Sequence, residues 1–474
     1  MKVIIFGGGP AGLSAAYEAC RLGLIPILYE KEADVGGISR TINYKGYLFD
    51  IGGHRFFSKD REICKIWEDV LGPELLVRPR LSRIYYRNRF FDYPLKPLNA
   101  LTNLGPIESA RILSSYVRSR FAPRKPPANF EEWVTSRFGR RLFQIFFKSY
   151  TEKVWGMPCT EIQADWAAQR IKSLSLAKAV LGSLRLLGKD RVTTLIEEFR
   201  YPRKGPGQMW NEVKNIIEKN GGHTELCSRL VRLKKRGNKI ICAEIHSLGV
   251  LNEVAGDHYL SSLPLRDLIA LIDPPPPDPV LRAAKMLRYR DFFTVGLIIK
   301  KPFLFRDNWI YIHAPDVKVG RIQNFKNWSP DMVPDQETIS LGLEYFCNRT
   351  DSIWGESDKK LIELGIEELA KLGFARPDDI SDGVVIRSLN TYPIYDDGYQ
   401  ERVEIIRDYL GGIANFQTIG RNGLHRYNNQ DHSMLSGLYA VRNIVEKRYQ
   451  VWEINIDDEY LEANIPDKGS FSKL

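Results

Sequence analysis

The sequence has few cysteines and no long apolar run, and both absences narrow what the protein can be. Its six cysteines are scattered through 474 residues, without a C-x-x-C pair or a histidine at zinc-ligand spacing. We therefore predict no metal site and a reducing, cytoplasmic environment. No stretch contains the roughly 18 apolar residues that a membrane-spanning helix needs, and we find no internal repeat or low-complexity tract. These absences argue against a disulfide framework, a zinc domain and a transmembrane segment.

The balance of charge is only mildly positive. With 68 Lys and Arg against 58 Asp and Glu, the formal net charge is +10, and 43% of the residues are apolar. The basic clusters 118–125 and 234–236 lack the repeated aromatic residues of a nucleic-acid groove, so we predict no nucleic-acid partner. The chain is long enough for two or three domains with a buried core.

The N-terminal residues predict a dinucleotide-binding unit. A buried strand over 2–6 precedes the segment 7-GGGPAG-12, and helical periodicity follows over 13–22. The glycines in the G-x-G-x-x-G frame are Gly7, Gly9 and Gly12. Such glycines allow a tight turn, close approach of the backbone to a pyrophosphate and close packing of a helix whose N-terminus faces the phosphates. A second strand over 24–31 contains Glu30, which suits the hydroxyls of a ribose.

A second glycine pair distinguishes FAD from NAD. The segment 35-VGGISRT-41 follows Glu30 closely and contains Gly36, Gly37 and Arg40. The two glycines let the backbone approach a cofactor, and the arginine can meet phosphate charge. This extension resembles the amine oxidase and protoporphyrinogen oxidase superfamily of FAD enzymes. The resemblance favours FAD as the cofactor.

That superfamily implies a cofactor domain assembled from separated segments. We expect an α/β fold with a Rossmann-type FAD-binding domain built from discontinuous segments, a helical substrate domain and an antiparallel sheet domain. The expected boundaries are 1–95, 196–270 and 386–450 for the three parts of the FAD-binding domain, 96–195 for the helical domain, 271–385 for the sheet domain and 451–474 for a C-terminal tail.

The last cofactor segment, 418–447, predicts a strand, a loop and a helix that begins near Asp431 or Ser433. The N-terminus of such a helix would stabilise negative charge on the flavin. The cofactor-binding residues expected in this segment are Gly420, Asp431, Ser433 and Met434.

The segment 150-YTEKVWG-156 mixes aromatic and charged residues, and it resembles a signature of bacterial UDP-galactopyranose mutases. Further similar segments follow the same chain order: 50-DIGGHRFFSK-59, 89-RFFDYPLKPLN-99, 318-KVGRIQNF-325, 391-TYPIYD-396 and 420-GRNGLHRYNNQDHSMLSGLYAVRNI-444. The resemblance implies an enzyme in which N5 of reduced FAD attacks the anomeric carbon of a nucleotide-linked hexose and expels the nucleoside diphosphate. Its substrate would be a UDP- or dTDP-linked sugar of polysaccharide biosynthesis, converted between pyranose and furanose rings.

A leaving diphosphate requires cationic donors, and planar guanidinium groups meet phosphate oxygens best. Arg321 and Arg421 stand at the two arginine positions of the family, and His54 stands on its flavin-facing loop. These three are the catalytic residues that the resemblance implies. The structural alternatives are a histidine satisfied by local backbone and, for Arg321, a strand residue paired with a carboxylate.

Five further residues are expected to bind the substrate. Tyr392 and Tyr427 match tyrosines that contact the diphosphate in the family. Tyr150 matches the tyrosine that stacks on the uracil base, and Trp155 matches the tryptophan that walls the sugar pocket. Asn429 stands where the mutases have an aspartate, so the identity of the sugar stays open.

Other interpretations of the same residues remain. Phe143, Phe146 and Phe147 recur at helical spacing, which is more typical of a core face than of a ligand platform. A true FAD oxidoreductase of the amine oxidase or protoporphyrinogen oxidase type is the alternative function, and a flavin-binding structural protein without catalysis is a weaker third. A monomer and a homodimer are both compatible with the sequence.

Overall fold

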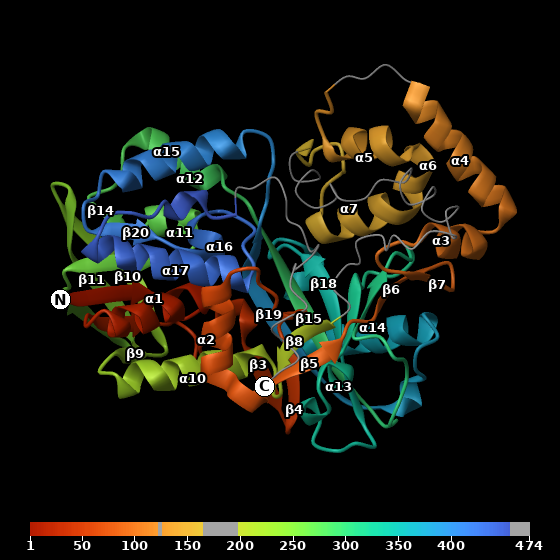
Figure 1. Ribbon diagram of the computed structural model, residues 1–474, viewed down its shortest axis with the longest axis horizontal. Helices are drawn as coiled ribbons and strands as arrows, with labels where there is room; N and C mark the ends of the chain where they lie inside the picture. Colours follow the sequence, from red (N-terminus) through yellow and green to blue (C-terminus); the bar gives the residue numbers. More distant parts are fainter. Residues whose placement is uncertain (122–125, 165–197, 456–474) are drawn as a thin grey trace. The chain divides into compact units, whose positions relative to one another are not determined.

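The computed structural model describes residues 1–121, 126–164 and 198–455, which fold into two compact units. Of these residues, 1–76, 201–291 and 388–455 form unit 1, and 77–121, 126–164, 198–200 and 292–387 form unit 2. The end of the expected helical segment 96–195 and most of the expected tail 451–474 lie outside the described residues. Segments that are far apart in the sequence meet within each unit (Figure 1).

Unit 1 is built on a five-stranded parallel sheet, as the dinucleotide-binding pattern predicts. Its strands, in spatial order, are β20 (Phe416–Thr418), β13 (His258–Ser261), β1 (Lys2–Phe6), β2 (Ile25–Tyr29) and β9 (His223–Glu225). The pairings between them are all parallel. Both faces are covered, which is why β1 is a nearly continuous apolar run rather than an alternating one.

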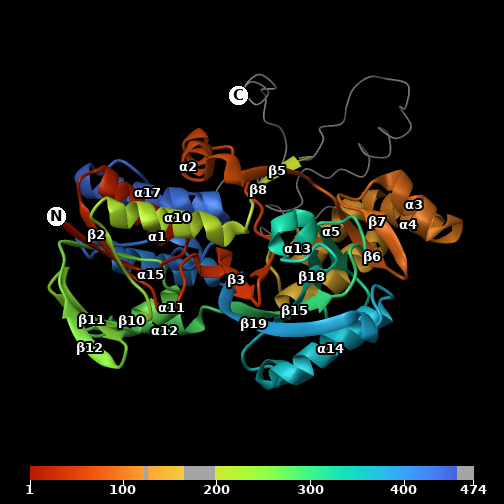
Figure 2. The same ribbon diagram turned by 90° about the horizontal axis from the view of Figure 1, so that it is seen from below.

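Helices cover one face of this sheet, and a smaller sheet covers the other. The first face carries α1 (Pro10–Arg21), α2 (Arg61–Leu71), α10 (Pro206–Lys219) and α17 (Gln430–Val445). The second carries β10 (Ser228–Arg236), β11 (Lys239–Ser247), β12 (Val250–Val254) and β14 (Ile272–Asp273), with α11 (Leu265–Ile269), α12 (Asp278–Met286) and α15 (Tyr399–Gly411) (Figure 2). Alternate residues of β1 divide between the layers, since Val3 and Ile5 pack beneath the helices and Ile4 and Phe6 pack on the other side.

Unit 2 is built on a seven-stranded mixed sheet. Its strands, in spatial order, are β19 (Ile380–Pro393), β15 (Tyr289–Ile299), β18 (Ile339–Cys347), β17 (Arg321–Asn324), β16 (Trp309–Ile312), β6 (Ser82–Tyr86) and β7 (Arg89–Asp92). The neighbours β16, β17 and β18 pair antiparallel, as expected, whereas β6 joins β16 in parallel. One face of the sheet is apolar and packs under α14 (Asp358–Lys371), so the polar residues of these strands lie on the opposite face.

Unit 2 also contains a group of helices. They are α3 (Pro97–Leu104), α4 (Pro106–Phe121), α5 (Phe130–Phe138), α6 (Arg140–Phe143) and α7 (Ser149–Trp155), with a π-helical turn over Gln144–Lys148. Phe143 and Phe146 are 1% and 4% exposed, and Phe147 stacks on Phe138. The aromatic stripe is therefore core, as its helical spacing predicts.

Short elements complete both units. Unit 1 contains β3 (Thr41–Tyr44), β4 (Tyr47–Asp50) and α16 (Gly420–Gly423), unit 2 contains α13 (Phe325–Trp328), and β5 (Leu75–Pro79) and β8 (Glu198–Pro202) carry the chain from one unit to the other. Within the described part of the chain, no helix combines the length and the apolar character that crossing a membrane requires.

Candidate active site

The turn between β1 and α1 has the close geometry that its glycines predict. Gly7 has φ +103°, and a Cβ at Gly12 would lie 1.9 Å from the carbonyl oxygen of Gly7. Only glycine fits either position. Gly9 is the N-cap of α1, and because it has no side chain to accept them, the first amide groups of the helix stay directed out of its N-terminus. A helix N-terminus of this kind binds phosphate.

The second glycine pair lies against this turn. The amide of Gly36 donates to the carbonyl oxygen of Gly8 over 2.7 Å, and Gly36 has φ +103°. Gly37 has φ +56°, and a Cβ there would lie 3.2 Å from the Cα atom of Gly9. The two backbone loops therefore touch, with no room for side chains between them. Arg40 follows at the end of the loop, with its side chain 16% exposed.

Glu30 lies just beyond β2 and holds the same turn. Its Oε2 accepts from the amide of Gly8 over 2.5 Å, and its Oε1 accepts from the amide of Glu32 over 2.9 Å. Burial raises the pKa of the Glu30 carboxyl. Each carboxylate oxygen keeps a second lone pair that a ribose hydroxyl can use. Glu30 thus shapes the loop and also presents acceptors at the predicted ribose position.

The C-terminal cofactor segment packs directly on the N-terminal turn. The amide of Gly420, in α16, donates to Ser436 Oγ over 2.8 Å, and a Cβ at Gly420 would lie 2.9 Å from Ala11 Cβ. A Cβ at Gly437, in α17, would lie 2.2 Å from the carbonyl oxygen of Ala11. The helices α1 and α17 therefore approach more closely than side chains would allow, and both ends of the chain contribute to one site in unit 1.

The first turn of α17 contains the other predicted cofactor residues. Asn429 is its N-cap, and a capping box forms because its side chain accepts from the amide of His432 while its own amide donates to Nδ1 of His432 over 3.4 Å. Asp431 and Ser433 are buried behind it. Met434 is 1% exposed, and its sulfur accepts the indole N–H of Trp67 over 3.1 Å. The Met434 side chain thus lies in the core beneath the site.

His54 lies on the loop that follows β4. Its carbonyl oxygen accepts from Nε2 of Gln430, at the start of α17, over 3.5 Å. Phe56 stacks on Trp67 of α2 with ring centres 4.0 Å apart and is 2% exposed, so it is a core residue. The loop is therefore held between α17 and α2.

Asp50, at the base of this loop, is a buried acid that the sequence patterns did not single out. Its carboxylate accepts from the hydroxyl of Tyr201 and, over 2.8 Å, from Thr41 Oγ1. Thr41 Oγ1 in turn accepts from the amide of Gly207, in α10, over 3.0 Å. Burial raises the pKa of Asp50 to about 7. This network ties the His54 loop to the glycine turn at the start of α10.

Unit 1 brings three predicted site residues together. The guanidinium of Arg421 lies 4.7 Å from the ring centre of Tyr427 and 5.6 Å from that of Tyr392. The two tyrosine rings stack on each other at 5.5 Å. Arg421 donates through Nε to the carbonyl oxygen of Asn428 over 2.8 Å and through NH1 to that of Thr391 over 3.1 Å. Both acceptors are neutral, so these bonds orient the guanidinium without cancelling its charge.

Arg321 begins β17 in unit 2, where a buried acid holds it. Its Nε and NH2 donate to Oε2 of Glu344 over 2.9 Å and 2.6 Å. Gln323 donates to the other carboxylate oxygen over 2.9 Å. The side chain of Glu344 is 0% exposed and that of Arg321 is 17% exposed. Two of the five N–H donors of the guanidinium thus engage one carboxylate oxygen, which fixes its orientation.

An aromatic cluster lies beside Arg321. Tyr311, on β16, stands directly opposite Arg321 in the strand pair. The rings of Tyr311 and Tyr150 meet edge to face at 5.4 Å, and Tyr150 stacks on His313 at 4.9 Å. Burial, together with the nearby Lys153 cation, lowers the pKa of His313 to about 3. The ring beneath Tyr150 is therefore a neutral imidazole at physiological pH.

The rest of the 150–156 segment fastens α7 to this cluster. Nζ of Lys153 donates to three backbone carbonyl oxygens, those of Ala314 at 2.6 Å, Ile312 at 3.3 Å and Val319 at 3.3 Å. Trp155 is 5% exposed and packs inside unit 2. The mixture of charge and aromatic rings thus has a local explanation, because the lysine anchors the helix that carries Tyr150.

Small polar side chains lie on the same face of the sheet as Arg321. The atoms Ser82 Oγ, Thr294 Oγ1, Ser340 Oγ and Gln323 Oε1 are buried and have no protein hydrogen-bond partner among the described residues. Buried polar atoms are costly unless a ligand or an ordered water satisfies them. If the Arg321 face of the sheet packed only against other protein, these polar atoms would have no function there. The face is therefore suited to binding polar groups.

Several of these residues carry little sequence signal. Tyr311 and His313 lie in an ordinary strand and its end, and Lys153 lies inside the recognised motif without a predicted role. Glu344 is the clearest missed residue, because an acid inside the otherwise apolar run 339-ISLGLEYFC-347 indicates a buried charge with a specific partner. Asp50 follows an apolar strand in the same way.

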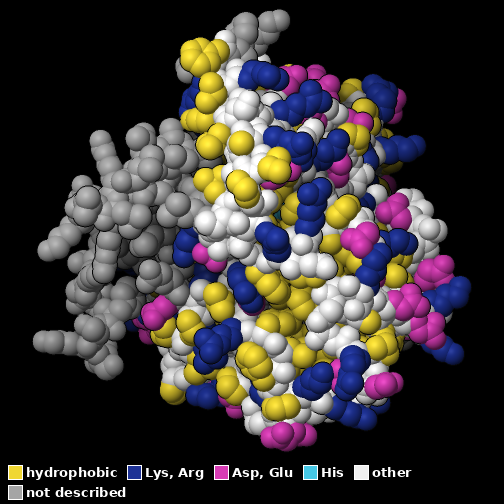
Figure 3. Space-filling model, turned by 90° about the vertical axis from the view of Figure 1, so that its right-hand side faces the viewer, with side chains coloured by type: hydrophobic (Ala, Val, Ile, Leu, Met, Phe, Trp, Pro, Cys, Tyr) yellow, Lys and Arg dark blue, Asp and Glu magenta, His cyan; other side chains and the backbone are white. Residues whose placement is uncertain are grey.

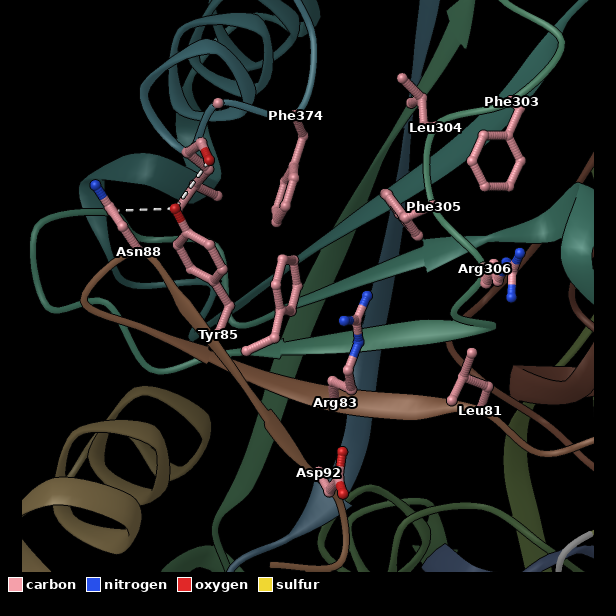
Figure 4. A pocket seen from close by; sticks show the side chains of 13 residues that line it. Leu81, Arg83, Tyr85, Asn88, Asp92, Phe303, Leu304, Phe305, Arg306 and Phe374 are labelled. Atoms are coloured by element: carbon pink, nitrogen blue, oxygen red, sulfur yellow. Dashed lines mark hydrogen bonds between the residues drawn. The ribbon is translucent and has the colours of Figure 1, made fainter. Parts of the chain in front are cut away.

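A separate hollow of about 730 Å³ lies at the β6–β7 edge of the sheet in unit 2 (Figure 4). Its walls are largely aromatic and include Tyr85, Phe90 and Phe374. Its polar groups are satisfied by the protein, since Arg83 makes two hydrogen bonds to Asp307, at 2.9 Å and 2.6 Å, and the hydroxyl of Tyr85 donates to a backbone carbonyl oxygen. The residues that line it include none of the predicted site residues.

Comparison with known sequences gives a family and one curated relative. Residues 10–402 match the family described as flavin containing amine oxidoreductase. A probable UDP-galactopyranose mutase of Klebsiella pneumoniae is 24% identical over 173 residues, which are 35% of this chain and 43% of the relative. The matched part therefore spans less than half the length of that relative.

Solved structures share the fold along almost the whole chain. The crystal structure of reduced UDP-galactopyranose mutase has a TM-score of 0.84 at 24% identity and covers 96% of this chain and 97% of its own. That of a putative protoporphyrinogen oxidase from Exiguobacterium sp. 255-15 has a TM-score of 0.72 at 18% identity, with coverages of 94% and 99%. These likenesses confirm the predicted fold class.

Geometry and family agree on the cofactor. Two neighbouring helix N-termini, two glycine loops in contact and an acid at the end of β2 are the features that a flavin dinucleotide requires. The match over residues 10–402 to a flavin-containing family confirms FAD as the cofactor. The chain belongs to the flavin-containing amine oxidoreductase family.

Proposed function

We propose that this protein is an FAD-dependent mutase that interconverts the pyranose and furanose forms of a UDP- or dTDP-linked hexose for polysaccharide biosynthesis. The observation that carries the proposal is the cluster of Arg421, Tyr392 and Tyr427, in which neutral carbonyl groups orient a guanidinium beside two tyrosines. This arrangement suits a diphosphate, whereas an amine or an apolar substrate would not require it. The likeness to UDP-galactopyranose mutases supports the proposal.

Arg421 and the tyrosines beside it bind the diphosphate as it leaves the anomeric carbon. Arg421 supplies a full positive charge, and the hydroxyls of Tyr392 and Tyr427 donate further hydrogen bonds to the phosphate oxygens. The tyrosine rings also hold the guanidinium by cation–π contact. Arg321 is the second proposed donor, and Glu344 fixes the orientation of its guanidinium. These contacts stabilise negative charge that grows on the leaving group.

The remaining substrate residues hold the base and the sugar. Tyr150, stacked on the neutral ring of His313, is a fixed platform for a flat base. The resemblance assigns Trp155 and Asn429 to the sugar. The glycine loops and Glu30 would hold FAD, which in its reduced form would supply the electron pair for displacement of the diphosphate. His54 lies on the loop that α17 holds at the cofactor segment.

An FAD oxidoreductase of the amine oxidase or protoporphyrinogen oxidase type is the second candidate. The description of the family and the likeness to a putative protoporphyrinogen oxidase favour it. Such an enzyme passes electrons from its substrate to oxygen or another acceptor. The Arg421 cluster has no evident use in that chemistry, which is why the mutase is preferred.

Anaerobic assays distinguish the two functions. The purified protein is reduced with dithionite and incubated with UDP-galactopyranose, UDP-glucose and dTDP-galactose, and the products are separated by chromatography. A furanose product that appears only after reduction supports the mutase. Bleaching of the flavin by an amine or a porphyrinogen without dithionite, with peroxide release in air and no furanose from any nucleotide sugar, overturns it.

We place this reaction in the cytoplasm. None of the six cysteines, which all lie in the described ranges, forms a disulfide, as a reducing compartment favours. Measuring enzyme in fractionated cells tests the location, and recovery outside the cytoplasmic fraction and its membrane-associated part would contradict it.

A further inference from the structure

The helix α4 packs with one face only. Ile112 is buried at 2% exposure, and Ser115 Oγ accepts from the amide of Arg141, in α6, over 3.0 Å. Glu108 is the one acidic residue of α4, and it forms an ion pair with Arg141 as well. These contacts fix the inner face of the helix against α5 and α6. They also use up the negative charge of α4.

The outer face of α4 carries an exposed apolar stripe. Its large members are Ile107, Leu113, Val117 and Phe121, which are 71%, 40%, 52% and 86% exposed. With about 100° of rotation per residue, these positions and Ala110 fall within about 120° of the helix circumference. A stripe of this width is normally buried in a globular protein, so its exposure indicates a partner.

Arginines border the stripe on both sides. The same rotation places Arg111 and Arg118 along one edge and Arg120 along the other, and all three are exposed. Glu108 pairs with Arg111 at 3.7 Å as well as with Arg141, so no acid on α4 balances Arg118 and Arg120 along the stripe. Figure 3 views the side of unit 2 on which α4 lies, and it shows hydrophobic and basic side chains next to each other over its upper part.

We propose that the outer face of α4 docks this protein onto an anionic lipid bilayer. The apolar side chains enter the boundary of the headgroups, and the flanking arginines reach the lipid phosphates with their charged ends. The observed combination of an apolar stripe and unbalanced positive charge fits this surface better than the alternatives. A twofold contact between two copies would set arginine against arginine. A nucleic acid would leave the apolar stripe without a partner.

Docking is independent of the proposed nucleotide-sugar chemistry, because none of the residues assigned to that chemistry lies on α4. Its consequence is functional all the same. A protein held at a membrane surface by one helix would release its product beside that surface.

Vesicle binding tests the proposal with the full-length flavin-bound protein. Sedimentation is measured with vesicles of phosphatidylcholine alone and of equimolar phosphatidylcholine and phosphatidylglycerol. We expect binding to the anionic vesicles, little to the neutral ones, and a steep loss as salt is raised. Absence of binding to anionic vesicles at low salt overturns the proposal.

Matched variants locate the contact. V117E/F121E places two charges in the stripe, and we expect it to weaken binding at least about tenfold. R118Q/R120Q should also weaken binding to the anionic vesicles at low salt, and we expect each lost arginine to contribute about fivefold. The control is V250E/L251E on β12 in unit 1, which makes the same charge change at side chains that are 57% and 56% exposed, and it should bind like the wild type.

Three results would reject α4 as the docking helix. The first is wild-type binding by V117E/F121E, and the second is an equal loss of binding in V250E/L251E. The third is a wild-type dimer in light scattering that V117E/F121E converts to a monomer, which would make the stripe a protein interface. Bound-flavin absorbance and the melting temperature are recorded for each variant, so that loss of fold is not mistaken for loss of binding.

Discussion

Arg321 and Arg421 are assigned the same task, yet the two units hold them in different ways. In unit 2, Arg321 is paired with the fully buried carboxylate of Glu344. In unit 1, Arg421 is oriented by two neutral carbonyl groups and flanked by two tyrosine rings. The first guanidinium belongs to a pair without net charge, and the second keeps its charge.

This difference gives the two arginines different main roles, one in the stability of the fold and the other in anion binding. A buried ion pair is strongly coupled to stability, because removal of one partner leaves an uncompensated charge in a low dielectric. A guanidinium held by carbonyl groups can be lost with little harm to the fold, but its attraction for a diphosphate is lost with it. We therefore expect Arg321 to matter most for folding and Arg421 most for catalysis.

The largest effect is expected for Arg321→Ala. It leaves Glu344 buried without its cation, and we expect the free energy of unfolding to fall by about 3–5 kcal/mol. Urea unfolding of the flavin-bound protein measures it. The double variant R321A/E344A removes both charges and should recover much of the loss. A loss below about 1 kcal/mol in the single variant would place the pair among ordinary surface ion pairs.

The next effect is expected for Arg421→Ala. We expect kcat/KM for the nucleotide sugar to fall by about 10²–10³-fold, because a donor to the leaving group is gone. Unfolding free energy should change by only about 1 kcal/mol, the size of the lost hydrogen bonds. Arg421→Lys should retain part of the activity, since it keeps the charge without the planar fork.

The control for Arg421 is Arg407→Ala. Arg407 lies on α15 of the same unit with a side chain that is 48% exposed. Arg407→Ala should leave the activity unchanged and should change the free energy of unfolding by no more than about 0.5 kcal/mol. Full activity in Arg421→Ala would remove the main support for a diphosphate site.

Much of unit 1 could be predicted from the sequence because its signals are local. The glycine turn, the strand at 2–6 and the helix after it follow from spacing within a few residues, and the structure has all three. The strands β13 and β20 also join this sheet, although they come from distant segments, as the expected discontinuous fold implies.

Unit 2 was harder because its site depends on register between strands. Arg321 was singled out, but Tyr311 and Glu344 reach it only through the pairing of β17 with β16 and β18. Spacing along one strand does not contain that information. The parallel pairing of β6 with β16 was missed for the same reason, since it joins residues more than 200 positions apart.

The acid sensitivity of the two units offers a finer test. The pKa of His313 is lowered from 6.5 to about 3 in the folded protein, so between these pH values only the unfolded chain binds the proton. Its contribution to stability is complete above pH 6.5 and is lost as pH falls, by about 1.4 kcal/mol for each pH unit.

His313→Phe keeps a ring beneath Tyr150 and removes this proton. Urea unfolding between pH 4 and about 7 should therefore show a shallower pH dependence than the wild type. His425→Phe is the matched change in unit 1, where burial lowers the pKa of His425 to about 4. Identical pH dependence in His313→Phe and the wild type would mean that His313 is not held neutral.

The smallest effects are expected for the affinity for UDP, and they distinguish the role of Tyr150 in unit 2 from that of Tyr427 in unit 1. Tyr150 is assigned a stacking role, so Tyr150→Phe should leave the affinity for UDP within about twofold, while Tyr150→Ala should weaken it about fivefold. Tyr427 is assigned a hydroxyl that donates to phosphate, so Tyr427→Phe alone should weaken UDP binding about fivefold. Calorimetric titration of the reduced protein measures both. If Tyr150→Phe lost more than Tyr427→Phe, the hydroxyl in unit 2 would be the phosphate donor, and the roles of the two clusters would be exchanged.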